Sequence, residues 1–339
     1  MVRAHAADET TRIKAASGGV LTALAKFLLD QSEVAFIYHA RQSEDDLTFG
    51  VPHISRTAAD VAHGTSSIYG PTPILEIMSD VLDIGEPFAF IGKPCDISAV
   101  RNLARYDPRV DRLVKICMTP VCGGIVPPPQ MNDFLAQRQT DRDNLTRFAY
   151  RGDMCPGDTE FETRDGHKHT ANFFEPYGGI EETSWQLPFR CKVCPDGPGE
   201  AADISAGDIW PNDVPDWETA DEDKGSNAVL VRSAVGRKLF DAAVEAGVIV
   251  IEEDVSPRYY DTCQHHHVKK KQYMRPRYDA LLEAGRTVPR TAGLRLDTFA
   301  ADLDDETYHW QKSGTLSRLQ SGKADELAPK ARWDRKSND

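Results

Sequence analysis

The chain has 339 residues, 40% of them hydrophobic and 27% charged, and a formal net charge of −13. This composition is typical of a water-soluble protein with one large or two smaller domains, and the acidic balance argues against nucleic-acid binding, which needs a concentrated basic surface. We expect no membrane span and a cytoplasmic location, because no apolar run approaches 20 residues and the charged amino terminus precedes no apolar segment.

Strands and helices alternate over residues 15–138. Helices are predicted at residues 17–29, 74–82, 97–103 and 130–137, and strands at residues 34–38, 87–91 and 113–117. The first helix has an apolar stripe through Val20, Leu24 and Leu28, with Ser17 as its expected N-cap. Such alternation is typical of an α/β layer with at least some parallel strand pairs.

The second half has a different pattern. Strands are predicted at residues 146–150, 159–163 and 168–173, with a turn at Asp165-Gly166, and a strand, helix and strand follow at residues 228–232, 235–246 and 248–252. Residues 211–227 are acidic and rich in turn formers, which indicates a loop, and the polar residues after 312 are expected to form an arm or a partly disordered tail. We predict an α/β protein with mixed sheets and flanking helices.

Four of the seven cysteines stand in positions typical of ligands, and in a reducing compartment disulfides are not expected. Cys191 and Cys194 form a C-x-x-C pair, Cys95 follows Lys93 in a turn before a helix, and Cys122 follows a strand beside two glycines. A helix N-terminus favours a thiolate. Four sulfurs suit structural zinc or an iron–sulfur cluster, and one pair with two scattered cysteines is less typical of zinc.

The other cysteines leave alternatives open. Cys117 lies within a predicted strand and is expected in the core, yet it competes with Cys122 as a ligand. Cys155, in a loop, is a possible fifth ligand or redox thiol. Cys263 precedes three histidines that point in different directions on a helix and so cannot all bind one ion. Alternatively, the scattered cysteines are buried apolar residues and the C-x-x-C pair is incidental.

Two loops are suited to anions. Ser17, Gly18 and Gly19 open a helix, where free backbone N–H groups favour a pyrophosphate. Residues 63–70 form a hydroxyl-rich loop of the same kind. Neither matches G-x-G-x-x-G, so a Rossmann site is not indicated. The basic run at residues 269–271, with Arg275 and Arg277, is either a local phosphate site or a solvated helix face.

The segments SGGVLTALAKFLL, GKPCDISAVR and CKVCPDGPGEAADISAGDIW occur in this order over about residues 14–295. In them the chain resembles the coenzyme F420 hydrogenase/dehydrogenase beta subunit family, which includes ferredoxin-dependent chlorophyll reductases. The resemblance implies an oxidoreductase with FAD and one 4Fe–4S cluster. Electrons would pass between a ferredoxin-like partner or a deazaflavin coenzyme and a small hydride-accepting substrate. It also implies an N-terminal domain at 14–90, a flavin and iron–sulfur domain at 91–295 and a tail at 296–339, with the cofactors between the first two.

The resemblance further implies specific site residues. The cluster ligands would be Cys95, Cys122, Cys191 and Cys194, although a cysteine in the hydrogenase branch is closer to Cys117. The residues expected to bind FAD are Ser17, Gly18, Gly19, Thr65, Ser66, Ser67, Tyr69, Lys93, Gln264, His265 and His267. Tyr69, His265 and His267 are also candidate proton donors, and no catalytic residue is assigned.

The chain departs from the family pattern in two places. The turn reads GKPCD rather than GTPCQ, which places the charges of Lys93 and Asp96 near the expected cluster. A ferredoxin-like cysteine run near the amino terminus is absent from this sequence, so we expect a second cluster to be missing or to belong to a partner. Two other functions remain open: a non-catalytic electron-relay subunit and a zinc-stabilised binding protein.

Overall fold

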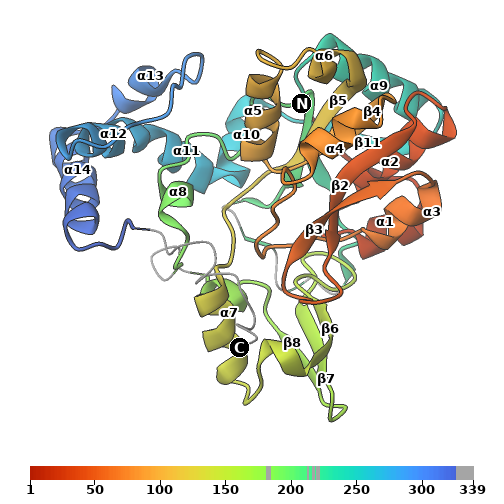
Figure 1. The fold of residues 1–339 in the computed structure, drawn as a ribbon, viewed down its shortest axis with the longest axis horizontal. Coiled ribbons are helices and arrows are strands. Elements are labelled where there is room, and N and C mark those ends of the chain that lie inside the picture. Colours follow the sequence, from red (N-terminus) through yellow and green to blue (C-terminus); the bar gives the residue numbers. More distant parts are fainter. Residues whose placement is uncertain (181–184, 212–213, 216–217, 219–221, 326–339) are drawn as a thin grey trace.

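The computed structural model describes residues 1–180, 185–211, 214–215, 218 and 222–325. Part of the predicted loop at 211–227 and the last 14 residues of the predicted tail, 326–339, lie outside these ranges. In the described part of the chain, the largest element is an eight-stranded sheet with the order β11-β1-β10-β9-β5-β4-β2-β3 (Figure 1). Its strands are β1 (Val2–Ala6), β2 (Phe36–Gln42), β3 (Gly50–Ser55), β4 (Phe88–Ile91), β5 (Val114–Pro120), β9 (Ile204–Asp208), β10 (Asn227–Val231) and β11 (Ile249–Asp254).

The sheet is mixed. Strands β2, β4, β5 and β9 are parallel to one another, whereas β3, β10, β1 and β11 pair antiparallel at the two sides. Helices cover both faces: α1 (Glu9–Lys14), α2 (Val20–Asp30), α3 (Ala58–His63), α4 (Met78–Asp83), α5 (Pro94–Leu103), α6 (Arg109–Leu113) and α9 (Ala234–Glu245). The predicted fold class, α/β with mixed sheets and flanking helices, is confirmed.

The central strands are apolar on both faces because a helix layer covers each side. Along β2, Ile37 packs with α2 and α9, while Phe36 and Tyr38 pack with α4, α5 and α6. In β4, Ala89 faces the first layer and Phe88 the second. Burying one such large side chain contributes about 1.5–3 kcal/mol, so both layers are needed to hold the sheet.

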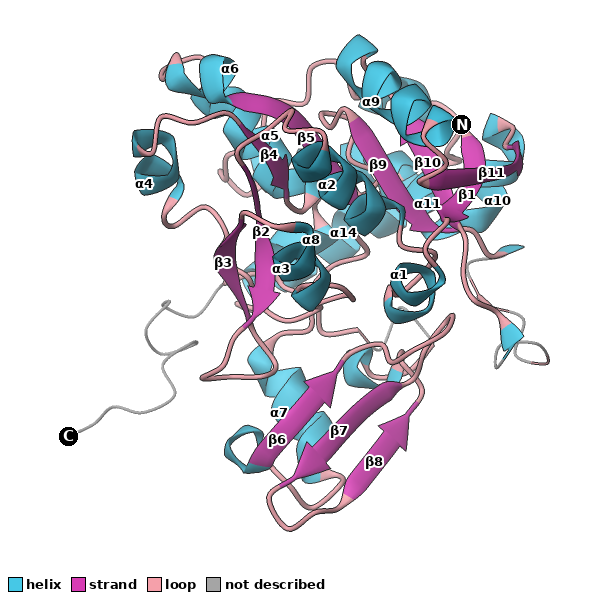
Figure 2. Cartoon of the chain, turned by 90° about the vertical axis from the view of Figure 1, so that its right-hand side faces the viewer, coloured by secondary structure: helices cyan, strands magenta, loops and turns pink. Residues whose placement is uncertain are grey.

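A smaller sheet lies below the large one, separated from it in Figure 2. It consists of β6 (Leu145–Ala149), β7 (Thr159–Thr163) and β8 (Lys168–Ala171), packed with α7 (Pro128–Ala136) and two short helical turns, η1 (Arg142–Asn144) and η2 (Glu175–Tyr177). The predicted turn at Asp165-Gly166 is confirmed, with a Gly166 φ of +85°. The Tyr150 hydroxyl donates to the Thr48 carbonyl at 2.7 Å and so ties this sheet to the β2–β3 connection.

The C-terminal residues form a group of helices beside α8 (Phe189–Lys192), at the left of Figure 1. They are α11 (His265–Gln272), α12 (Met274–Glu283), α13 (Leu296–Ala300) and α14 (Asp305–Gln320), whereas the preceding α10 (Pro257–Cys263) packs with β10 of the large sheet. The expectation of an arm after residue 312 is wrong as far as Gln320. Helix α14 packs against α12 and buries Gln311 and Thr315, polar residues that no apolar periodicity reveals.

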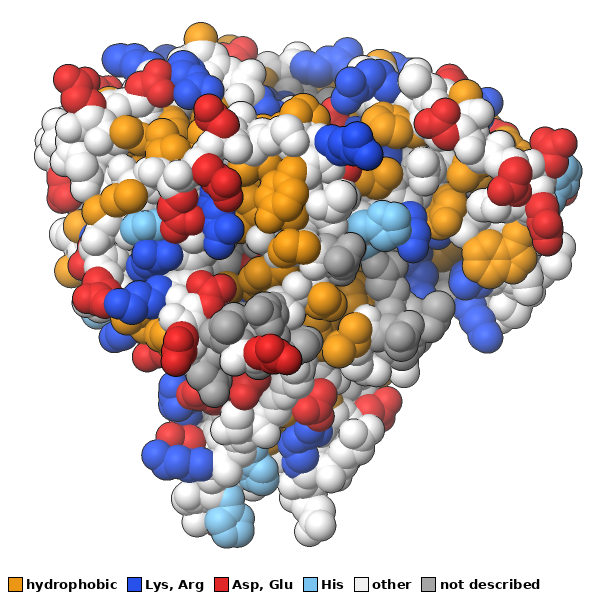
Figure 3. Space-filling model, turned by 180° about the vertical axis from the view of Figure 1, so that it is seen from behind, with side chains coloured by type: hydrophobic (Ala, Val, Ile, Leu, Met, Phe, Trp, Pro, Cys, Tyr) orange, Lys and Arg blue, Asp and Glu red, His pale blue; other side chains and the backbone are white. Residues whose placement is uncertain are grey.

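Positive and negative side chains are interspersed over the face shown in Figure 3, so this face carries no patch of a single sign despite the net charge of −13. Within the described residues, none of the helices has the length and apolar character that crossing a bilayer requires.

Candidate functional site

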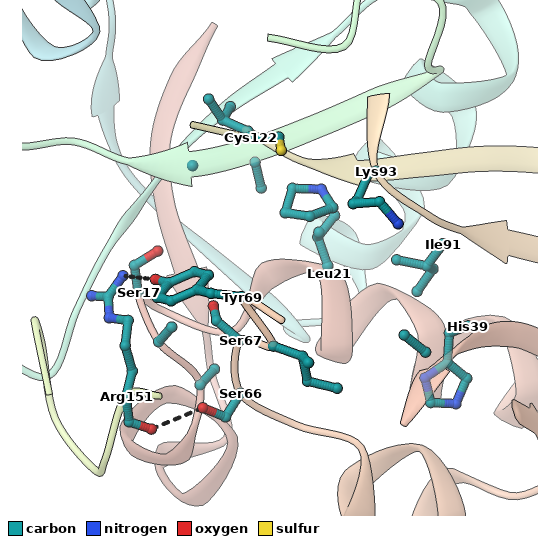
Figure 4. Close-up of a pocket in the computed structure, with 18 of the residues that line it drawn as sticks. Ser17, Leu21, His39, Ser66, Ser67, Tyr69, Ile91, Lys93, Cys122 and Arg151 are labelled. Atoms are coloured by element: carbon teal, nitrogen blue, oxygen red, sulfur yellow. Dashed lines mark hydrogen bonds between the residues drawn. The ribbon is translucent and has the colours of Figure 1, made fainter. Parts of the chain in front are cut away.

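A cavity of about 280 Å³ lies at the carboxyl ends of the parallel strands β2, β4, β5 and β9 (Figure 4). This edge is where open α/β sheets bind their ligands. Six of the residues predicted to bind FAD line it: Ser17, Gly19, Ser66, Ser67, Tyr69 and Lys93. The predicted ligand Cys122 lines it as well. Segments far apart in the sequence therefore meet around one space.

The start of α2 forms one wall of the cavity, and its backbone requires glycine. Gly18 has a φ of +99°, and a Cβ there would lie 2.8 Å from the Ser226 Cα. The predicted Ser17 N-cap is wrong, because Gly19 occupies the N-cap position without a side-chain bond. Asn227 on β10 takes this role, since its amide oxygen accepts from the Val20 N–H at 3.2 Å and its amide nitrogen donates to the Ser17 hydroxyl at 2.8 Å.

The hydroxyl-rich loop forms a second wall. Ser66 donates to the Arg151 carbonyl at 2.9 Å, and Tyr69 lies with its ring centre 5.4 Å from those of Tyr150 and Tyr177. Burial raises the pKa of Tyr69, so its hydroxyl stays protonated at neutral pH. Thr65, in the same loop, is outside the lining.

Lys93 brings a positive charge to the cavity. Its ammonium lies 2.7 Å from the Asp96 carboxylate and donates to the Thr72 carbonyl at 3.0 Å. Desolvation acts to lower the pKa of Lys93, but the Asp96 carboxylate outweighs it and holds the pKa above its usual value. The lysine is therefore charged at neutral pH. Its partner Asp96 is the last residue of the GKPCD turn.

An ion pair between Arg151 and Asp208 closes the far end of the cavity, and the sequence pattern did not reveal it. Arg151 is 2% exposed, its guanidinium lies 3.1 Å from both Asp208 oxygens, and it stacks on Phe173 and Trp210. Burial acts to lower the Arg151 pKa, but Asp208, Tyr69 and Cys155 together outweigh burial and hold the pKa above its usual value. The sequence offered one sign of this ion pair, the acidic residue Asp208 at the end of the segment ADISAGD, which forms the end of the buried strand β9.

Two residues of the segment ADISAGD, Asp203 and Gly207, have contacts that explain their residue type. Asp203 accepts from the Cys117 N–H at 2.7 Å and from Arg101 at 2.9 Å, which joins β9 to β5 and α5. A Cβ at Gly207 would lie 2.7 Å from the Val121 Cβ, so glycine allows β9 to approach the loop that carries Cys122.

The four predicted ligand cysteines come from three segments, at the start of α5, after β5 and around α8. Cys95 is exposed in the first turn of α5, whereas Cys122, Cys191 and Cys194 are half-buried in loops or on α8. Burial, and next the Cys122 thiolate, raise the pKa of Cys191 to about 11. Desolvation, followed by Asp96 and Cys122, raises the pKa of Cys95 to about 12. The charges of Cys122 and Cys194 therefore act on the other thiols of the set.

A backbone hydrogen bond joins the two main cysteine loops. The Cys122 N–H donates to the Gly197 carbonyl at 3.0 Å, three residues after Cys194. The other cysteines lie elsewhere. Cys117 is fully buried among the helices of the second layer, Cys263 packs beside β10, and Cys155 lies with its sulfur 3.8 Å from an Arg151 nitrogen.

In the described ranges, no three His, Cys, Asp or Glu side chains lie close enough to hold one metal ion. An iron–sulfur cluster separates its ligands more widely than a single ion does, because a cube of iron and sulfide lies between them.

His267 provides an observation that fits such a cluster. It is 5% exposed, and both of its ring nitrogens are buried without a hydrogen-bond partner among the described residues. The ring packs on Gly197, where a Cβ would lie 2.0 Å from its Cε1 and 2.9 Å from the Cys122 carbonyl oxygen. A buried polar group without a partner calls for one, and cluster sulfur accepts hydrogen bonds.

The remaining predicted FAD residues do not line the cavity in the described structure. Gly18 lies behind Gly19, and Gln264 donates to the Asp208 carbonyl at 2.8 Å. His265 is exposed, whereas the rings of His266 and His267 lie with their centres 3.9 Å apart, so the expectation that all three histidines point in different directions does not hold for this pair. Their assignment to FAD stays a prediction.

Two family models match this chain. The beta subunit N-terminal model of coenzyme F420 hydrogenase/dehydrogenase matches residues 1–79, and the C-terminal model matches residues 85–256. The F420-dependent formate dehydrogenase subunit beta of Methanocaldococcus jannaschii is 24% identical over 255 residues, 74% of this chain but only 60% of that protein. The coenzyme F420 hydrogenase subunit beta of Methanococcus voltae is 24% identical over 307 residues, 85% of this chain and 96% of that protein.

A solved structure shares the fold. A chain of the F420-reducing [NiFe] hydrogenase complex from Methanosarcina barkeri matches with a TM-score of 0.56 and 19% identity, over 80% of this chain and 91% of that chain. At this identity the likeness establishes the architecture and nothing further.

Proposed function

Because the chain belongs to the coenzyme F420 hydrogenase/dehydrogenase beta subunit family, we propose that it is the electron-transfer subunit of an oxidoreductase complex. FAD binds in the cavity, and one 4Fe–4S cluster binds to Cys95, Cys122, Cys191 and Cys194. The subunit passes electrons between an iron–sulfur partner and a hydride-exchanging small molecule. The names of the relatives favour the deazaflavin coenzyme F420 as that molecule.

One observation carries this proposal: Cys122 belongs to both parts of the site. Its side chain lines the cavity, and its charge influences the thiols of Cys95, Cys191 and Cys194. A ring system in the cavity would therefore lie next to any centre that these thiols hold. Adjacent cofactors are what an electron-transfer subunit needs.

The cavity suits the flat ring of a flavin. Its volume of about 280 Å³ is close to the lower end of small-molecule sites, and half-buried Ser66 and Ser67 show that it opens to solvent, so the rest of the dinucleotide extends outward. Leu21, Ile91 and Tyr69 supply apolar surface (Figure 4). The N–H groups at the start of α2 are suited to the pyrophosphate. When bound, the flavin supplies hydride transfer and the change between one- and two-electron steps.

Lys93 and Asp96 act on this site in opposite directions, and the contribution of the lysine can be isolated by substitution. Lys93 lines the cavity, and its charge also acts on the Cys95 and Cys122 thiols, so one ammonium lies near both cofactor positions. A positive charge favours the more negative, reduced form of a nearby cofactor. The lysine of the GKPCD turn therefore raises the reduction potential of the site.

The proposal is tested by anaerobic purification followed by an absorption spectrum and by iron, sulfide and flavin quantification. We expect a brown-yellow protein with four iron atoms and one flavin per chain, and Cys191→Ser should lose the iron and keep the fold. Zinc without iron would identify a zinc-stabilised binding protein instead. Both cofactors without turnover of F420 would identify a relay that depends on its complex.

A further inference from the structure

The segment formed by α11 and α12 contacts both loops that carry the predicted ligands Cys122, Cys191 and Cys194. This segment, residues 265–283, follows the last residue matched by the family models, residue 256. In Figure 1 these helices lie beside α8 and apart from the large sheet.

Helix α11 contacts the loop of Cys122 and the chain just after Cys194. The Lys270 ammonium donates to the Gly123 carbonyl at 2.6 Å, directly after Cys122. Lys271, only 7% exposed, forms an ion pair with Glu200, and His267 packs on Gly197. The basic run at residues 269–271 was predicted to bind phosphate or to face solvent. Two of its lysines, Lys270 and Lys271, instead make contacts within the protein.

Helix α12 contacts the residues between Cys191 and Cys194. Arg277 donates from Nη1 to the Lys192 carbonyl, and the Tyr278 hydroxyl donates to the Val193 carbonyl at 3.3 Å. The Arg277 Nε also donates to the Gln311 side chain on α14 at 3.0 Å. Arg277 therefore links the C-terminal helix to the C-x-x-C loop.

Apolar contacts support the same arrangement. Phe189 and Val193, which flank Cys191, pack on a cluster formed by Met274, Tyr278, Leu281 and Leu296. Helix α8 has four residues, too few to form a stable helix alone. Its position is therefore fixed by these neighbours rather than by its own backbone bonds.

We infer that α11 and α12 position the two cysteine loops, with Arg277 and Tyr278 as positioning residues for the Cys191–Cys194 loop and Lys270 for the Cys122 loop. The role of these residues in cluster retention rests on the proposed function. Their role in holding the loops does not, because the contacts are made between groups of the protein itself.

The matched pair Arg277→Met and Arg275→Met tests this inference. Arg275 lies on the same helix but pairs with Asp279 and Asp297 and contacts neither loop. In iron-free, full-length protein, iodoacetamide should alkylate Cys191 and Cys194 about tenfold faster in Arg277→Met than in wild type, and Arg275→Met should match wild type. Per-site mass spectrometry gives the rates, and circular dichroism confirms that each variant is folded. Equal rates in the two variants would overturn the inference.

Two further comparisons keep the inference testable if Arg277→Met does not fold. Tyr278→Phe removes one hydroxyl and should also speed alkylation of the C-x-x-C loop. Lys270 also lowers the pKa of Cys122, so its variant is read by a probe that does not depend on the thiolate: Lys270→Met should speed hydrogen exchange of the Cys122 amide, whereas exposed Lys269→Met should not. Unchanged rates in both Tyr278→Phe and Lys270→Met would contradict the assignment.

Iron release separates this inference from the proposed function. In anaerobically purified protein, Arg277→Met should lose iron to a chelator at least tenfold faster than Arg275→Met, the size of effect typical of residues that orient metal ligands. If anaerobically purified wild type contained no iron but Arg277→Met were still alkylated faster than wild type, the positioning role would be supported while the proposed function failed. If wild type contained iron and both variants released it at equal rates, the proposed function would be supported while the role of Arg277 in cluster retention failed.

Discussion

Both carboxylate oxygens of Asp208 lie 3.1 Å from one guanidinium nitrogen of Arg151, and this ion pair forms the far wall of the cavity. Asp208 comes from the end of β9 and Arg151 from the chain just after β6. The pair therefore connects the large sheet to the small one at the point where the cofactor is expected.

Asp208→Asn should destabilise the protein, because it leaves the buried guanidinium of Arg151 with a neutral partner. We expect a loss of about 3 kcal/mol in the free energy of unfolding, measured by urea denaturation. Arg147→Met is the matched control, since Arg147 pairs with Glu160 on the surface of the small sheet and should cost less than about 1 kcal/mol. Equal losses in the two variants would show that the Arg151–Asp208 pair has no special role.

Stability should fall as the pH is lowered from 6.5 towards 4, because His39 is buried in its neutral form. Burial, and next the His53 charge, lower the pKa of His39 from 6.5 to about 4. The unfolded chain takes up the proton first, so the stabilisation is complete above pH 6.5 and is lost as the pH falls, by up to roughly 3 kcal/mol.

His39→Gln should remove part of this pH dependence of stability. Another part of the same sign should remain, because burial also lowers the pKa of His267. The measurement is the free energy of unfolding at pH 5 and pH 7. An identical difference in wild type and His39→Gln would contradict the assignment.

Gly18→Ala should weaken flavin binding and stability together. Its φ of +99° is strained for alanine, and the added Cβ would meet the Ser226 backbone at 2.8 Å. We expect a cost of about 1–3 kcal/mol and a higher flavin dissociation constant, measured by fluorescence titration. Gly314→Ala, within α14, serves as the control and should stabilise by up to about 1 kcal/mol. Normal flavin affinity in Gly18→Ala would exclude the start of α2 as part of the flavin site.

Lys93→Met should make the flavin and cluster harder to reduce, because it removes the ammonium that lies near both positions. Spectroelectrochemical titration should give more negative midpoint potentials than in wild type. Lys115→Met removes an equal charge from an exposed position on β5 and should leave the potentials unchanged. Wild-type midpoint potentials in Lys93→Met would show that the lysine charge does not act on the cofactors.

The sequence predicted the alternating core well, because helices and central strands with strong apolar patterns are fixed by local periodicity. It missed β3, because Pro52 within the segment argues against a strand. Proline is tolerated there because β3 is an edge strand, where some backbone groups need no ladder bond. It also misjudged α14, whose buried positions include Gln311 and Thr315. In these elements tertiary contacts, rather than composition, determine the structure.

The functional site, too, was predicted only in part from the sequence. Motif spacing and the family resemblance identified the cysteines and the glycine turn. The Asn227 bond to Ser17 joins residues 210 positions apart, and the Arg151–Asp208 pair joins residues 57 apart. No local pattern encodes such contacts, because they depend on how β9 and β10 are placed beside β5 and α2. Arg277 was visible in the sequence only as part of a basic run.

The most direct test of the account is iron, sulfide and flavin quantification in anaerobically purified Cys122→Ser and Cys117→Ser, compared with wild type. The account predicts four iron atoms and one flavin per chain in wild type and in Cys117→Ser, and loss of iron in Cys122→Ser. Loss of iron from Cys117→Ser with full retention in Cys122→Ser would contradict the claim that the thiol lining the cavity is also a cluster ligand.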